Sequence, residues 1–199
     1  MRVWCIYGAY TRRQNCIYNE AVVVDRKGQT LYIYQKQHLW QLMEKGEITP
    51  GPGTNRVIET EFGKIGVIIC WDIAFPEATR KLAQQGAQIV FCPAYWYGRQ
   101  HHTSEIIRIL PQVRAFENQI YFVLCDAATW ETAGRSRICS SLQTLAATNN
   151  TDERILIATA DLEELEKRRR LFDCWRTQQR SKSDIACAFP PGSSIEEIE

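Results

Sequence analysis

Short apolar runs bounded by turn-forming residues recur along the chain, and their lengths are typical of β-strands. The run 64–70 is rich in β-branched residues and too short for a helix of its own, so it predicts a buried strand. Turn residues at 26–29 and 61–63 join four of the runs into two hairpins. The predicted strands are 20–25, 31–36, 56–60, 64–70, 88–92 (ended by Pro93), 120–125, 138–142 and 155–160.

Helical patterns follow three of these strands. Pro76 opens the first helix and Gly86 closes it, which is the usual punctuation of helix ends. The second helix, 104–118, carries apolar side chains at helical spacing, with Pro111 as a position for a kink. The third, 162–170, begins with acidic and ends with basic residues, as the helix dipole favours. Alternating strands and helices with antiparallel hairpins predict a two-layer α/β domain.

The composition indicates one folded domain with a balanced surface. With 199 residues, 45% of them hydrophobic, the chain can bury one large core, and we expect a domain over residues 1–180. Residues 181–199 are rich in Ser, Pro, Gly and Glu and are expected to be disordered. The net charge of +1 provides no attraction to nucleic acid or to an anionic membrane surface, so neither is an expected partner. No apolar run approaches the roughly twenty residues of a membrane-spanning helix.

The cysteines favour a reducing compartment over a disulfide framework. None of the eight belongs to a Cys-x-x-Cys pair, and several end apolar strands, as buried thiols do. We therefore expect a cytoplasmic protein. A zinc site is not expected without paired ligands, and the sequence has no glycine-rich phosphate-binding motif, so no metal or cofactor is predicted.

Cys70 is a candidate for chemistry because it follows a predicted strand just before a helix begins. A thiol near a helix amino terminus lies in a field that favours the thiolate, its reactive form. An inert buried thiol is the alternative, since Cys92 and Cys125 also end strands. A nucleophilic cysteine needs a cation or base beside it. Lys36 ends the second strand of the first hairpin and can supply the cation, although solvated surface lysines are more common.

Three motifs resemble those of the carbon–nitrogen hydrolase (nitrilase) superfamily. They are Tyr34-Gln-Lys36-Gln-His-Leu39, then Glu44, and then Gly66-Val-Ile-Ile-Cys70-Trp-Asp-Ile-Ala-Phe-Pro-Glu77. Further segments resemble the family in the same order along the chain, at 18–21, 86–94, 114–123 and 135–138. Several motifs in family order are far more specific than any one of them.

The resemblance implies an α-β-β-α sandwich, with subunits that pair through helices into homodimers or higher homo-oligomers. It also implies that the Cys70 thiolate attacks the carbon of a small amide, carbamoyl or nitrile substrate and forms a thioester that water then hydrolyses. Lys36 and the backbone N–H of Trp71 would stabilise the negative charge that develops. Glu44 would position Lys36, and no cofactor takes part.

The residues around the cysteine refine the expected substrate. Trp71-Asp72 followed by Phe75-Pro76-Glu77 is more similar to the amidase and carbamoyl-amide branches of the family than to true nitrilases. An amide or N-carbamoyl substrate is therefore expected, with a nitrile as the alternative. The residues expected to stabilise the oxyanion or contact the substrate are Trp71, Glu77, Tyr95, Trp96 and Tyr97.

The family's first catalytic glutamate has no counterpart ahead of Lys36. That glutamate ends an early strand in the family, and residues 1–35 contain no Pro-Glu strand end. We therefore expect the chain as given to lack the family's amino-terminal segment, with Glu44 or Glu77 as a substitute base. Two functions are expected: a hydrolase of non-peptide carbon–nitrogen bonds, or an inactive family member that binds a ligand or serves as an oligomer subunit.

Overall fold

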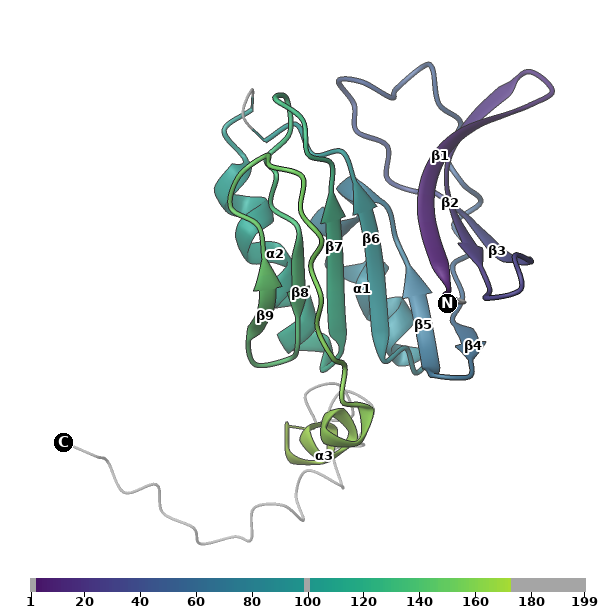
Figure 1. Cartoon of the computed structure of the whole chain (residues 1–199). Coiled ribbons are helices and arrows are strands. Elements are labelled where there is room, and N and C mark those ends of the chain that lie inside the picture. The colour runs from purple at the N-terminus through teal and green to yellow at the C-terminus, as the bar shows by residue number, and fades with distance from the viewer. Residues whose placement is uncertain (1–2, 99–100, 173–199) are drawn as a thin grey trace, which may run out of the picture.

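The computed structural model describes residues 3–98 and 101–172, which form two β-sheets and three α-helices (Figure 1). The smaller sheet is antiparallel and is built, in this order, from β1 (Cys5–Arg13), β2 (Cys16–Val24) and β3 (Thr30–Gln35). The larger sheet contains, in this order, β4 (Ile58–Thr60), β5 (Gly63–Val67), β6 (Ile89–Ala94), β7 (Tyr121–Asp126), β8 (Arg137–Cys139) and β9 (Thr144–Ala147).

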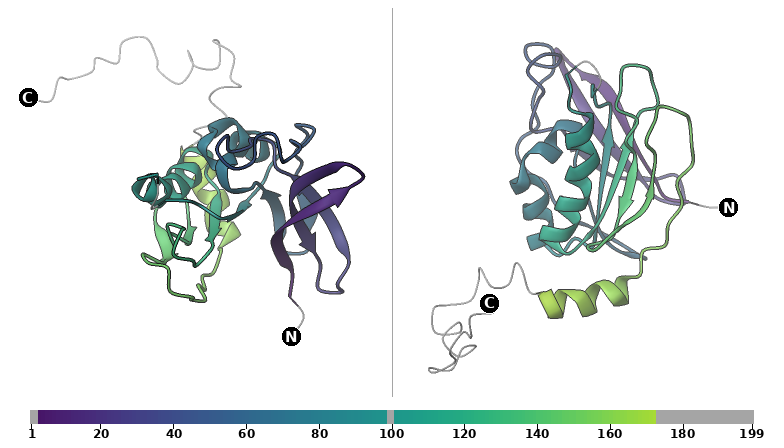
Figure 2. Two further views of the ribbon diagram at one scale, coloured as in Figure 1. Left: turned by 90° about the horizontal axis from the view of Figure 1, so that it is seen from above. Right: turned by 90° about the vertical axis from the view of Figure 1, so that its left-hand side faces the viewer.

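Helices cover one face of the larger sheet, and the smaller sheet lies on its other side. β5, β6 and β7 are parallel, and α1 (Pro76–Gln84) and α2 (Ser104–Asn118) connect them on the same face (Figure 2). The three-stranded sheet stands at an angle to the larger one, with β1 nearest to β6 (Figure 2). This arrangement confirms the α/β class and the two β-layers. In the described part of the chain, no helix lies on the outer face of the three-stranded sheet.

The predicted apolar runs form the core between α1, α2 and the central strands. Parallel strands are buried on both faces, which explains why the runs in β5 and β6 are continuous rather than alternating. Gly66 lets α1 approach β5 closely, because a Cβ atom there would lie 2.8 Å from Leu82 Cδ1. Side chains of this core with at most 1% exposure include Ile65, Val67, Leu82, Val90, Ile107, Phe122 and Leu124.

Both predicted hairpins form, and local turn chemistry explains the first. The Asp25 carboxylate accepts hydrogen bonds from the backbone N–H groups of Lys27 (2.8 Å) and Gln29 (2.9 Å). Gly28 follows with φ +84°, a left-handed conformation that suits glycine. The turn therefore closes without strain and sets the register of β2 against β3.

Two strand predictions were wrong. β6 continues through Pro93, which pairs with Cys125 of β7. The missing N–H is tolerated because β5 ends opposite Phe91, so one side of β6 has no partner strand at Pro93. Residues 155–160 are extended but form no strand, and Ile155 and Ile157 are more than four-fifths exposed.

α3 (Leu162–Phe172) lies beyond the end of the larger sheet and confirms the predicted charged helix (Figure 1). Its Arg169 is buried and donates to two backbone carbonyls, Gln119 O at 2.9 Å and Ala87 O at 2.6 Å. These residues follow α2 and α1, so one guanidinium satisfies carbonyls at the carboxyl ends of both helices. No helix in the described residues is long and apolar enough to cross a membrane. The predicted tail, 181–199, lies outside the described residues.

Replacing Arg169 by alanine should destabilise the fold, because two buried carbonyls would lose their donor. We expect a loss of about 2–3 kcal/mol in the free energy of unfolding, as is usual for buried hydrogen bonds to a charged group. Urea unfolding followed by circular dichroism measures this loss. Arg168→Ala is the matched control: it removes an i,i+4 pair with Glu164, which should contribute at most about 0.5 kcal/mol. Equal losses in the two variants would contradict the assigned role.

Candidate functional site

Cys70 lies at the start of a one-turn 3-10 helix, η1 (Cys70–Ala74), between β5 and α1. Its φ of 46° is in the left-handed region, which residues other than glycine rarely adopt. Such a conformation costs roughly 1–3 kcal/mol and persists only where the surroundings enforce it. The Cys70 Sγ lies 3.7 Å from the carbonyl oxygen of Tyr95, just beyond the end of β6. The sharp turn therefore presents the thiol at the carboxyl end of the parallel strands.

The Asp72 carboxylate holds this turn in place. It is fully buried and accepts a hydrogen bond from the backbone N–H of Ile69 (3.0 Å), directly before Cys70. It also accepts from the Tyr34 hydroxyl (2.8 Å) and from the backbone N–H of His38 (2.9 Å). Burial and the adjacent carboxylate raise the pKa of Tyr34, so its hydroxyl stays a donor. One carboxylate thus connects the turn at Cys70 to the end of β3.

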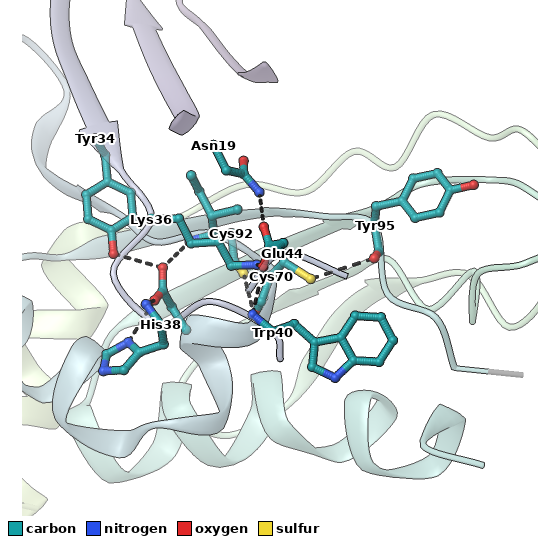
Figure 3. Close-up of polar contacts among 11 residues, drawn as sticks. Asn19, Tyr34, Lys36, His38, Trp40, Glu44, Cys70, Cys92 and Tyr95 are labelled. Carbon is teal, nitrogen blue, oxygen red and sulfur yellow. Dashed lines mark hydrogen bonds and ion pairs between the residues drawn. The ribbon is translucent and has the colours of Figure 1, made fainter. Parts of the chain in front are cut away.

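Lys36 and Glu44 form a buried ion pair beside Cys70 (Figure 3). Their exposed fractions are 2% and 4%, and Lys36 Nζ lies 2.5 Å from Glu44 Oε2. Glu44 also accepts hydrogen bonds from Asn19 Nδ2 (2.8 Å) and from the backbone N–H of Trp40 (2.8 Å). Buried charges are tolerated only when they are paired and hydrogen-bonded, as these are.

These groups line a cavity of about 540 Å³, which opens between β1 and the carboxyl ends of β6 and β7. Lys36, Glu44 and Cys70 all contribute to its wall. A second, smaller pocket of about 120 Å³ adjoins Cys70 and is lined mainly by aromatic rings. The structure therefore brings the predicted nucleophile, cation and acid together in one cavity.

In the unliganded site, the surroundings of Cys70 favour the thiol over the thiolate. Burial raises the pKa of the Cys70 thiol to about 11; the Lys36 ammonium lowers it in part, and Glu44 acts against Lys36. The short η1 turn provides little helix dipole. Because burial outweighs the effect of the Lys36 ammonium, the raised pKa favours the protonated thiol at neutral pH.

A second carboxylate, Asp126 at the end of β7, also lines the cavity. Burial raises the pKa of Asp126 to about 6, although the backbone N–H groups of Trp96 and Arg135 donate to it. Asp126 is therefore a cavity carboxylate whose pKa is raised towards neutral pH. Sequence reasoning missed it.

The other predicted residues divide into two groups. Trp71, Tyr95, Trp96 and Tyr97 line the aromatic pocket as expected. Glu77 does not reach either cavity, because it lies on the exposed first turn of α1.

Residues with no assigned role in the sequence complete the site. They are Asn19, Tyr34, Trp40, Asp72 and Asp126. A signal for Asp72 exists: an acid three residues after Ile69, just ahead of a helix, is the spacing of a capping box. The others depend on contacts across the two sheets and carry no local signal.

Comparisons with known proteins agree with this geometry. A sequence model of the family described as "Carbon-nitrogen hydrolase" matches residues 1–170. A 2-oxoglutaramate amidase of Bacillus subtilis is 31% identical over 77% of this chain and 60% of its own length. A nitrilase of Pyrococcus abyssi is 34% identical over 80% of this chain and 60% of its own length.

Solved structures agree on the fold. The crystal structure of a carbon–nitrogen hydrolase from Helicobacter pylori superposes with a TM-score of 0.81, at 24% identity over 94% of this chain and 70% of that one. The present chain spans only 60% of the length of each of the two relatives compared above.

The ion pair predicts how Cys70 reacts with iodoacetamide. With a thiol pKa near 11, the rate constant should rise about tenfold per pH unit from pH 7 to 10, with no plateau. Glu44→Gln should lower the thiol pKa, because the charge of Lys36 would no longer be compensated. Each unit by which the pKa falls should raise the rate at pH 7 about threefold, because the thiolate fraction increases more than the nucleophilicity of the thiolate decreases. Lys36→Met should slow the reaction. Peptide mass spectrometry identifies Cys70 among the other cysteines.

The exposed neighbours Glu47 and Lys45 provide matched controls for this measurement, as Glu47→Gln and Lys45→Met. Both controls change the same charges at positions where solvent screens them, so the labelling rate should stay within about twofold. A plateau below pH 9 in the unsubstituted protein, or equal effects of Glu44→Gln and Glu47→Gln, would show that the pair does not control the thiol.

Proposed function

This chain belongs to the carbon–nitrogen hydrolase family, and we propose that it hydrolyses an amide or N-carbamoyl substrate through a thioester at Cys70. The observation that carries the proposal is the buried Lys36–Glu44 pair in the same cavity as Cys70. A lysine and a glutamate are costly to bury, and the core does not need them. Their position beside a thiol on a strained turn supports a chemical role.

In the first step the Cys70 sulfur forms a bond to the carbonyl carbon, and the thiol proton is transferred to a carboxylate of the cavity. The carbonyl oxygen becomes negative, and the Lys36 ammonium and the backbone N–H of Trp71 stabilise it. Collapse of this intermediate breaks the carbon–nitrogen bond, and the amine leaves with the proton. Glu44 holds Lys36 in place through the ion pair.

In the second step water attacks the thioester, and a carboxylate accepts its proton. Among the described residues, two carboxylates line the cavity, those of Glu44 and Asp126. Glu44 accepts three hydrogen bonds already, and its main task is to orient Lys36. Asp126 has the pKa, about 6, that suits a general base near neutral pH.

The substrate branch rests on the residues that follow the nucleophile. Trp71-Asp72 and Phe75-Pro76-Glu77 resemble the amidase and carbamoyl-amide branches, and this supports an amide or N-carbamoyl group over a nitrile. The cavity of about 540 Å³ is large enough for a small molecule but not for a protein segment. We propose a reducing compartment, the cytoplasm, as the location of this thiol chemistry.

A second candidate function is an inactive family member that binds a ligand or serves as an oligomer subunit. The observation that favours it is the protonated state of Cys70, whose pKa near 11 leaves few thiolates at neutral pH. The two candidates differ in one measurable respect, because only a hydrolase forms an acyl adduct on Cys70.

Hydrolysis is tested by ammonia release from a panel of primary amides and N-carbamoyl amines. We expect release by the unsubstituted protein, an acyl adduct on Cys70 in acid-quenched samples by intact mass, and a loss of at least about 10³-fold in Cys70→Ala. Cys5→Ala is the matched control, since Cys5 is exposed on β1 and outside both cavities. Absence of both ammonia and adduct across the panel would favour the inactive candidate.

We also propose a homodimer that forms through α2. Four apolar side chains lie on one face of this helix and are 40–53% exposed, namely Ile106, Ile109, Val113 and Phe116. An exposed apolar stripe of this kind is costly in water and is typical of an interface. A second copy offers the same stripe, which a two-fold axis pairs with itself.

Sedimentation velocity tests the dimer. The unsubstituted protein should sediment as a dimer at micromolar concentration, and Ile109→Lys with Val113→Lys should give a monomer, because charges would be buried without partners. Leu142→Lys is the control, since Leu142 is 50% exposed on the turn between β8 and β9. A dimer that persists in the double variant would exclude α2 as the interface.

A further inference from the structure

We propose that the aromatic pocket beside Cys70 binds an uncharged apolar group of the substrate, such as a phenyl ring. The inference rests on the proposed function, because it assigns the substrate class of the same site. Cys70 lines both the larger cavity, which contains the Lys36–Glu44 pair, and the smaller aromatic pocket, and Trp40, Tyr95 and Tyr97 line both as well. A substrate whose carbonyl lies at Cys70 can therefore reach the charged groups of the larger cavity and, separately, the aromatic rings of the smaller pocket.

The walls of the pocket are mainly aromatic rings, joined by the side chains of Leu42, Cys70, His101 and Thr103. The Trp96 indole N–H donates to Thr103 Oγ1 (2.9 Å), and the Tyr95 hydroxyl donates to Glu131 (2.7 Å). Both polar groups thus already have hydrogen-bond partners within the protein and have little need of a ligand. The Trp71 and Trp96 rings pack at 5.4 Å between centroids, so the pocket has a rigid apolar wall.

The charge of the pocket argues against a cationic group. No carboxylate lines it among the described residues. Glu131, the acid bound to the Tyr95 hydroxyl, lies outside the lining. Ring faces alone attract a cation weakly unless an acid assists or the cation is fully desolvated. Burial of apolar surface is the larger contribution here, and it favours an uncharged group.

Trp40 is the residue that shapes this pocket. Its ring lies 5.3 Å from the Tyr97 ring and 6.5 Å from the Trp71 ring, measured between centroids. Its backbone N–H donates to Glu44, the carboxylate that holds Lys36. In the view of Figure 3, Trp40 and Tyr95 extend on one side of Cys70, and Tyr34 lies on the other. Glu44 therefore holds both the backbone of Trp40 and the Lys36 ammonium. We infer that Trp40, whose ring forms part of the pocket wall, is a specificity-determining residue.

The test compares three alkylating reagents that all react with Cys70. They are iodoacetamide, N-benzyl iodoacetamide and N-(2-trimethylammonioethyl) iodoacetamide, each normalised to its rate with free 2-mercaptoethanol. We expect the benzyl reagent to react about tenfold faster than iodoacetamide, from ring contacts and apolar burial. The cationic reagent should show no acceleration. Trp40→Leu should reduce the benzyl-to-iodoacetamide ratio about fivefold, since it removes one wall.

Trp130→Leu is the matched control, because this indole is 71% exposed and lies outside both cavities. The ratio of the two rates corrects for any change in folding or thiol pKa that a variant causes. A benzyl ratio near one, a cationic reagent that is the faster of the three, or equal ratios in Trp40→Leu and Trp130→Leu would each overturn the proposal. Alkylation needs no hydrolysis, so the benzyl-to-iodoacetamide rate ratio tests the pocket even if the protein releases no ammonia from amides. Conversely, a protein that hydrolyses amides but shows a rate ratio near one would overturn this proposal and leave the proposed hydrolysis intact.

Discussion

The buried carboxylate of Asp72 is the constraint on which the site depends. Its four hydrogen-bond contacts come from two segments that are distant in sequence: Tyr34 and His38 at and after the end of β3, and Ile69 directly before Cys70. A fully buried charge is tolerated only when such donors are all in place. The His38 ring also stacks on Phe75, at 3.9 Å between centroids, which closes the opposite end of the η1 turn. The left-handed conformation of Cys70 is held by this network, so the geometry of this turn depends on how the two sheets pack together.

A second buried pair, Lys36 and Glu44, sets the electrostatics. The pair holds a cation near the thiol, but burial raises the pKa of Cys70 to about 11, and the Glu44 carboxylate partly offsets the opposing effect of Lys36. In the proposed mechanism, this ammonium stabilises the oxyanion that develops during the reaction rather than a resting thiolate. Because Glu44 also accepts a hydrogen bond from the backbone of Trp40, one side chain contacts both the Lys36 ammonium and a residue of the aromatic pocket.

The fold was predicted where local chemistry is sufficient. The turn at Asp25 and Gly28, the proline at the start of α1 and the helical spacing of α2 are signals within a few residues, and each element formed. The predictions failed where the presence of a partner strand decides whether a segment is a β-strand. Pro93 stays inside β6 because β5 has already ended, and the run 155–160 is not a strand because no neighbour pairs with it. β-structure depends on the partner strand, which a local pattern does not contain.

The sequence alone determined the α/β class, the family resemblance and the three residues Lys36, Glu44 and Cys70, because their motifs are local and ordered along the chain. Only the tertiary structure decided the state and surroundings of these residues. The protonated thiol results from burial and from the compensation of Lys36 by Glu44, and neither can be read from spacing. Asp126 enters the cavity, and Glu77 stays outside it, because of the packing of β7 and α1. The physical reason is that charge, burial and strain at this site arise from contacts between segments that are far apart in the chain.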